Sequence, residues 1–75
     1  MHNLDVLDIQ AIATMAENLY FAMSNLSSLA FLSSEGMERE SHEQKAMSSV
    51  AEQLGAIGQE AKAVSSELYA IRDVA

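Results

Sequence analysis

The stretch "VAEQLGAIGQEAKAVSSELYAI", residues 50–71, decides the fold class of this chain. Its large apolar residues recur at steps of three and four once Ala61 is included, which is the spacing of one face of a helix. They are Val50, Leu54, Ile57, Val64, Leu68 and Ile71. In heptads, the leucines take a positions and the β-branched residues take d positions. In parallel coiled coils this choice favours tetramers over dimers. The stretch therefore indicates a long helix that needs several helical neighbours.

The start of this helix is marked by "SHEQ", residues 41–44. Ser41 followed three residues later by Gln44 is a capping box, in which both side chains satisfy free backbone N–H groups of the first turn. We expect the helix to cover residues 42–72.

An earlier stretch has the same three-four spacing. Its apolar residues are Ile12, Met15, Leu19, Ala22, Leu26 and Leu29. Asn3 or Asp5 can cap its start, and Asp5 and Asp8 complement the helix dipole. We expect this helix to cover residues 4–34, followed by a turn over residues 35–41.

Gly36 is the predicted stop signal of the first helix. A glycine just past a helix end commonly adopts the left-handed conformation, and a hydrophobic residue after it then packs on the last turn. In this sequence Met37 would pack against Leu32.

These patterns predict an all-α fold: one domain, residues 1–75, forming an antiparallel two-helix hairpin. Two helices cannot enclose a core, and the 75 residues include no cysteine that could staple a small fold. We therefore expect two hairpins to dimerise into a four-helix bundle. The expected oligomer interface consists of Ile12, Met15, Leu19, Leu26, Val50, Leu54, Ile57, Val64, Leu68 and Ile71.

Small residues flank this stripe on the second helix. Ala51, Gly58 and Ser65 follow one line, seven residues apart. Small side chains allow a neighbouring backbone to come close, so we expect another helix to pack tightly there. The alternatives are a bend at Gly55 and Gly58, or that the helix simply tolerates these two glycines.

The first helix carries more apolar surface than one stripe requires. Tyr20, Phe21 and Phe31 project away from the line through Ile12, and no charged residue occurs between residues 18 and 34. One interpretation is that the three aromatic residues pack inside the homodimer. The other is that they dock a different protein, because aromatic anchors among small polar residues are typical of binding hot spots.

Residue types that carry chemistry are sparse. His2 and His42 lack ligand spacing, since Arg39 occupies the position three before His42. We expect no catalytic, cofactor or metal site, no small-molecule substrate and no enzyme activity. A net charge of −7 with scattered Lys and Arg disfavours nucleic acid and anionic membranes. The absence of cysteine favours the cytoplasm.

Three functions remain open for such a chain. It can be a homodimeric regulator, antagonist or adaptor that docks a so far unidentified target protein through the first helix. It can be an acidic mimic that occupies the basic groove of a nucleic-acid-binding protein. It can also be a structural subunit that folds only inside a hetero-assembly.

Overall fold

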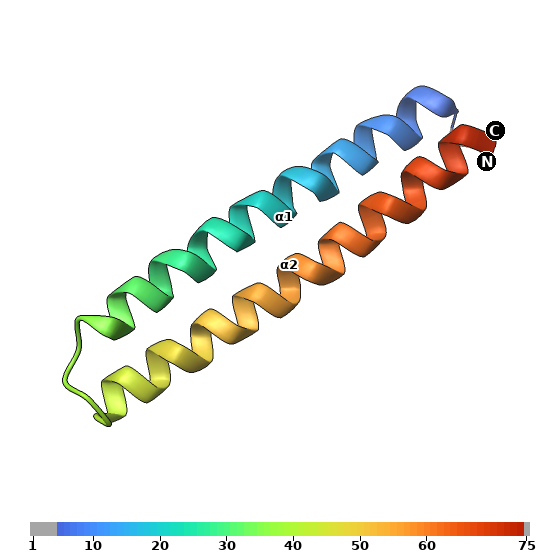
Figure 1. Cartoon of the computed structure of the whole chain (residues 1–75). Helices are drawn as coiled ribbons and strands as arrows, with labels where there is room; N and C mark the ends of the chain where they lie inside the picture. Colours follow the sequence, from blue (N-terminus) through green and yellow to red (C-terminus); the bar gives the residue numbers. More distant parts are fainter. Residues whose placement is uncertain (1–4, 75) are drawn as a thin grey trace.

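The computed structural model describes residues 5–74, and its two helices pack against each other as an antiparallel hairpin (Figure 1). Helix α1 spans Val6–Glu35 and helix α2 spans His42–Val74. Each observed end lies within two residues of the expected one. Asn3 and Leu4, where the first helix was expected to begin, lie outside the described residues. The hairpin measures 53 × 18 × 17 Å.

Asp5 caps the start of α1. Its backbone is extended, with φ −86° and ψ 177°, and its Oδ1 accepts the backbone N–H of Asp8 at 2.9 Å. This contact satisfies one of the free donors that every helix start leaves behind. Of the two predicted caps, the structure therefore uses Asp5.

Gln44 joins the two helix ends at the turn. Its backbone N–H donates to Ser41 Oγ at 3.1 Å, which is the first of the two contacts of the predicted capping box. Its side-chain Oε1 accepts the N–H of Glu40 at 2.8 Å rather than that of Ser41, which donates to the Glu38 carbonyl. The same amide donates through Nε2 to the Ser34 carbonyl at 3.1 Å, which fastens the end of α1 to the start of α2.

The predicted left-handed stop at Gly36 is wrong. Gly36 has φ −83° and ψ −3°, a right-handed conformation, and Leu32 remains 64% exposed. The chain instead leaves α1 in a tight turn, where Gly36 and Met37 donate to the carbonyls of Ser33 and Ser34, each at 3.2 Å. The left-handed residue is Glu40, with φ 65°, directly before the Ser41 cap.

The contact line between the helices, here called the seam, is built from small side chains. Among residues 5–74, Ile9 is the only large apolar side chain that is buried. The other buried seam residues are Ala13, Ser27, Ala30 and Ser34 of α1, and Ala51, Gly58, Ala61 and Ser65 of α2. A side chain on Gly58 would begin 3.2 Å from Met23 Cβ and 3.6 Å from the Tyr20 carbonyl oxygen. This is the close helix packing that Ala51, Gly58 and Ser65 predicted.

Candidate interaction surfaces

The seam divides the hairpin into two long faces. On α1, Ile12 and Leu26 each stand one residue before a seam residue; on α2, Val50, Ile57 and Val64 do the same. One step back along a helix turns the side chain by about 100°. Because the two helices are antiparallel and face each other, this step points to the same side of the hairpin on both.

We call this side the apolar face. It comprises Ile12, Leu19 and Leu26 of α1 and Val50, Ile57, Val64 and Ile71 of α2. All seven side chains are large and aliphatic, and their exposed fractions fall between 40% and 50%. Since helical neighbours normally bury such residues more fully, the face has the character of a core surface without its second layer.

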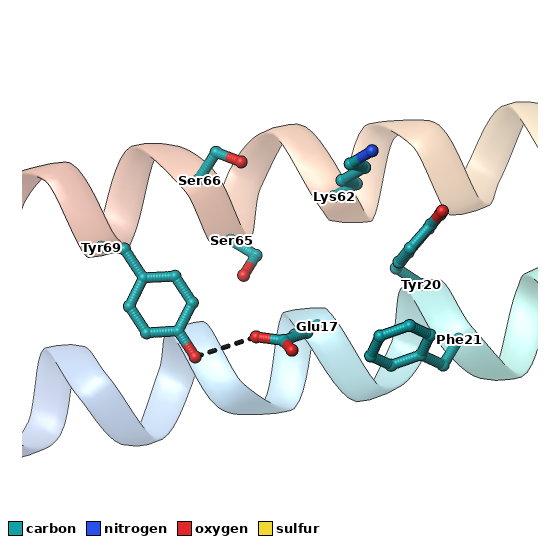
Figure 2. Close-up of a pocket in the computed structure, with 7 residues that line it drawn as sticks. All are labelled: Glu17, Tyr20, Phe21, Lys62, Ser65, Ser66 and Tyr69. Carbon is teal, nitrogen blue, oxygen red and sulfur yellow. Dashed lines mark hydrogen bonds between the residues drawn. The ribbon is translucent and has the colours of Figure 1, made fainter.

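The opposite side, here called the aromatic face, carries a shallow pocket of about 210 Å³. Figure 2 shows Tyr20 and Phe21 of α1 beside Lys62 of α2, with Tyr69 further along. The rings of Tyr20 and Phe21 lie 5.2 Å apart at 44°, and Lys62 Nζ lies 5.3 Å from the centre of the Tyr20 ring. That distance permits a cation–π attraction, so Lys62 covers part of the Tyr20 ring.

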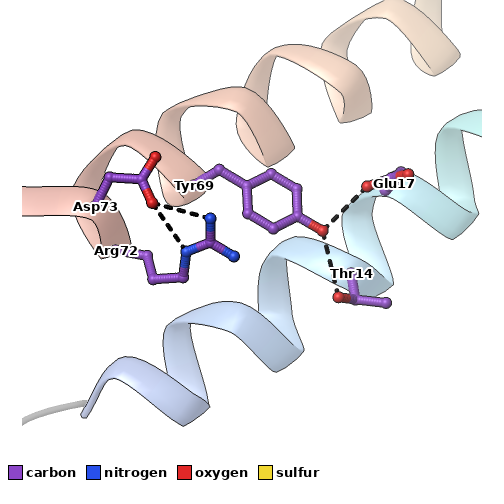
Figure 3. A network of polar contacts seen from close by, with 5 residues as sticks. All are labelled: Thr14, Glu17, Tyr69, Arg72 and Asp73. Atoms are coloured by element: carbon purple, nitrogen blue, oxygen red, sulfur yellow. Dashed lines mark hydrogen bonds and ion pairs between the residues drawn. The ribbon is translucent and has the colours of Figure 1, made fainter.

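A polar network closes the far end of this pocket (Figure 3). The Tyr69 hydroxyl donates to Glu17 Oε2 at 3.0 Å and lies 3.3 Å from Thr14 Oγ1. Arg72 lies over the Tyr69 ring at 4.8 Å and donates to Asp73 Oδ1 at 2.9 Å. Tyr69 therefore links α2 to α1 through its hydroxyl, and Arg72 covers one face of its ring.

The predicted interface residues sort into two groups. Eight are exposed, and Leu54 and Leu68 are half-buried between the seam and the apolar face. The predicted partner face is divided as well. Tyr20 is half-buried in the pocket and Phe21 is 53% exposed next to it. Phe31, 44% exposed, lies on the same side but about 15 Å further along α1 at 1.5 Å per residue.

Sequence reasoning missed Glu17, Lys62 and Tyr69 as parts of the aromatic face. Each stands one residue after a half-buried or buried residue of the seam side: Ala16, Ala61 and Leu68. This position relative to the seam can be recognised only once the register of the two helices is known. The heptad pattern places the large apolar residues of α2 at the centre of its contact face, whereas the seam follows Ala51, Gly58 and Ser65.

Comparison of this chain with protein-family models, with curated proteins and with solved structures finds no match. Neither described helix is long and apolar enough to cross a membrane. Within the part of the chain that the structure describes, no three His, Cys, Asp or Glu side chains gather as a possible metal site.

Proposed function

We propose that this protein works by binding other proteins and that its working unit is a homodimer. Two hairpins place their apolar faces together and form a four-helix bundle. The observation that carries the proposal is the contrast between the seam and the apolar face. The seam consists almost entirely of Ala, Ser and Gly, whereas seven large aliphatic residues stay 40–50% exposed in two parallel lines.

Free energy supports a second copy over a lone hairpin. Complete burial of one aliphatic side chain stabilises a fold by about 1.5–3 kcal/mol, and alanine contributes far less. A single hairpin leaves much of that stabilisation unused, and chains of this size are marginal by themselves. Val50 to Ile71 spans about 32 Å at 1.5 Å per residue, so the face offers a contact several turns long.

The aromatic face is the proposed docking surface for a target protein. It lies on the side opposite to the apolar face, so both surfaces can be occupied together. Phe21 and Phe31 are exposed, and Tyr20 packs against Gly58 with Lys62 over its ring. Aromatic anchors that are already ordered lose little side-chain entropy on binding. A homodimer with two such faces would act as a regulator, antagonist or adaptor.

The experiment compares two double variants with the natural chain by light scattering and by affinity capture from the native host. Leu19→Glu with Ile57→Glu introduces two charges on the apolar face, and we expect loss of the dimer. Phe21→Ala with Phe31→Ala leaves the apolar face intact, and we expect a dimer that no longer captures the target.

Two results would count against this function. Dimers that persist in the glutamate variant would remove the apolar face from the interface. Unchanged capture by the alanine variant would remove the aromatic face from target binding. An unfolded natural chain at all concentrations would instead favour a structural subunit of a hetero-assembly.

A further inference from the structure

We propose that the two hairpins of the bundle join like helix to like helix, with α1 beside the second α1, α2 beside the second α2, and the two turns at opposite ends. This inference rests on the proposed homodimer and specifies its geometry. The alternative places each α1 beside the second copy's α2 and brings both turns to one end. Both arrangements are symmetric dimers in which neighbouring helices are antiparallel, so the side chains at the edges must distinguish them.

The two edges of the apolar face differ in chemistry. The α1 edge lies next to Leu19 on the side of the helix that is further from the seam. It comprises Met15, Ala22 and Leu29. Met15 is 68% exposed and Leu29 is 60% exposed. The corresponding α2 edge lies beside Ile57 and Val64 and comprises Gln53, Glu60 and Glu67, all exposed. One edge is therefore apolar and the other is polar and acidic.

Only the like-to-like arrangement pairs each edge with an edge of the same chemistry. It sets the apolar edge of α1 against the same edge of the second copy, so Met15 and Leu29 gain apolar neighbours. The carboxylates of Glu60 and Glu67 then line the α2 edge, which stays open to water, where repulsion between exposed charges is weak and screened by salt. The alternative sets Glu60 and Glu67 beside Met15 of the second copy, which removes part of the hydration of both carboxylates, and sets Gln53 nearest to Leu29.

No cation of the described chain is placed to compensate for that loss. Lys62 lies over Tyr20 and Arg72 over Tyr69, both on the aromatic face. Lys45 lies 3.9 Å from Glu40 at the turn, where Arg39 is also found. Partly buried carboxylates without an ionic partner are unfavourable, which disfavours the arrangement with both turns at one end.

The lengthwise register is also consistent with the like-to-like arrangement. The α1 stripe from Ile12 to Leu29 is self-complementary when it runs antiparallel to itself, with its centre between Leu19 and Ala22. The α2 line of the apolar face, from Val50 to Ile71, has its centre close to Ala61, within one turn of Gly58. The 3.6 Å approach of the Gly58 Cβ position to the Tyr20 carbonyl puts these centres within about one turn of each other. One twofold axis can therefore serve both helix pairs.

The test uses the natural absence of cysteine. A single Glu38→Cys variant carries one spin label at each turn of the dimer. We expect a label–label distance of about 50 Å, because the hairpin is 53 Å long. Turns at one end would give about 20 Å, roughly two helix diameters.

A second variant, Ala22→Cys, places thiols beside the proposed axis, where we expect a disulfide between the two copies under oxidation. Ala56→Cys, exposed on the outer side of α2, is the control and should not cross-link.

The outcomes separate this inference from the proposed function. A dimeric mass with a short label distance, or with short and long distances together, overturns the like-to-like arrangement and leaves the homodimer standing. A dimer in which Ala22→Cys cross-links no better than Ala56→Cys also overturns it. A monomeric mass overturns the homodimer itself.

Discussion

Ser27 Oγ of α1 lies 2.8 Å from the carbonyl oxygen of Ala51 in α2. The reciprocal contact joins Ser65 of α2 to the carbonyl of Ala13 in α1 at 3.1 Å. The same step along the chain separates the two serines and the two alanines, so the hairpin has approximate twofold symmetry about its middle. Hydroxyls reach the opposite backbone only because Ala13 and Ala51, both fully buried, hold the helices close together.

We expect Ser27→Ala and Ser65→Ala each to lower the free energy of unfolding by about 0.5–1.5 kcal/mol, the usual net value of one hydrogen bond. The two sites lie several turns apart, so their effects should add within about 0.5 kcal/mol. Urea unfolding of the two single variants and the double variant measures this. A double variant as stable as the natural chain would show that the seam does not depend on these bonds.

The two interior glycines of α2 should respond differently to alanine. A Cβ on Gly55 would lie 3.5 Å from Ser27 Oγ, an ordinary contact, so Gly55→Ala should gain about 1 kcal/mol of helix propensity. A Cβ on Gly58 would lie 3.2 Å from Met23 Cβ, so Gly58→Ala should gain less. Gly58→Leu should cost about 1–3 kcal/mol by forcing the helices apart. Thermal unfolding of the three variants gives the order of their stabilities. A Gly58→Leu hairpin as stable as the natural chain would contradict the close seam.

Tyr69→Phe should lower stability by about 1 kcal/mol, because the Tyr69 hydroxyl bonds Glu17 and lies within hydrogen-bond distance of Thr14. Tyr20→Phe is the matched control. It retains the ring beneath Lys62, and among residues 5–74 the Tyr20 hydroxyl makes no side-chain hydrogen bond. Chemical denaturation should therefore separate the two variants, and equal loss in both would argue against the network in Figure 3.

Glu40→Gly should stabilise the chain by about 0.5–1 kcal/mol, because φ 65° is costly for a residue with a side chain and free for glycine. The exposed Lys45–Glu40 ion pair at 3.9 Å contributes little that could be lost. Glu38→Gly, at a position without positive φ, should bring no gain. Calorimetry of both variants tests the assignment of the left-handed residue to Glu40.

The sequence was sufficient to predict the two helices, because Asp5, Ser41 and Gln44 act within one turn of their own position. It also predicted that Ala51, Gly58 and Ser65 would admit a close neighbour. It did not predict which helix face would form the seam, because large apolar residues are a stronger pattern than small ones. The grouping of Tyr20 with Tyr69 depends on the register between helices, and no local spacing encodes that register. The turn was misjudged at Gly36 because Glu40 adopts the conformation usually reserved for glycine.

The central claim is that this hairpin needs a second copy to cover its apolar face. Sedimentation equilibrium over a wide concentration range, combined with thermal unfolding at each concentration, tests it most directly. The account predicts a particle of twice 8.1 kDa whose unfolding midpoint rises with concentration. A folded 8.1 kDa particle that unfolds cooperatively at one midpoint, independent of concentration, would contradict it.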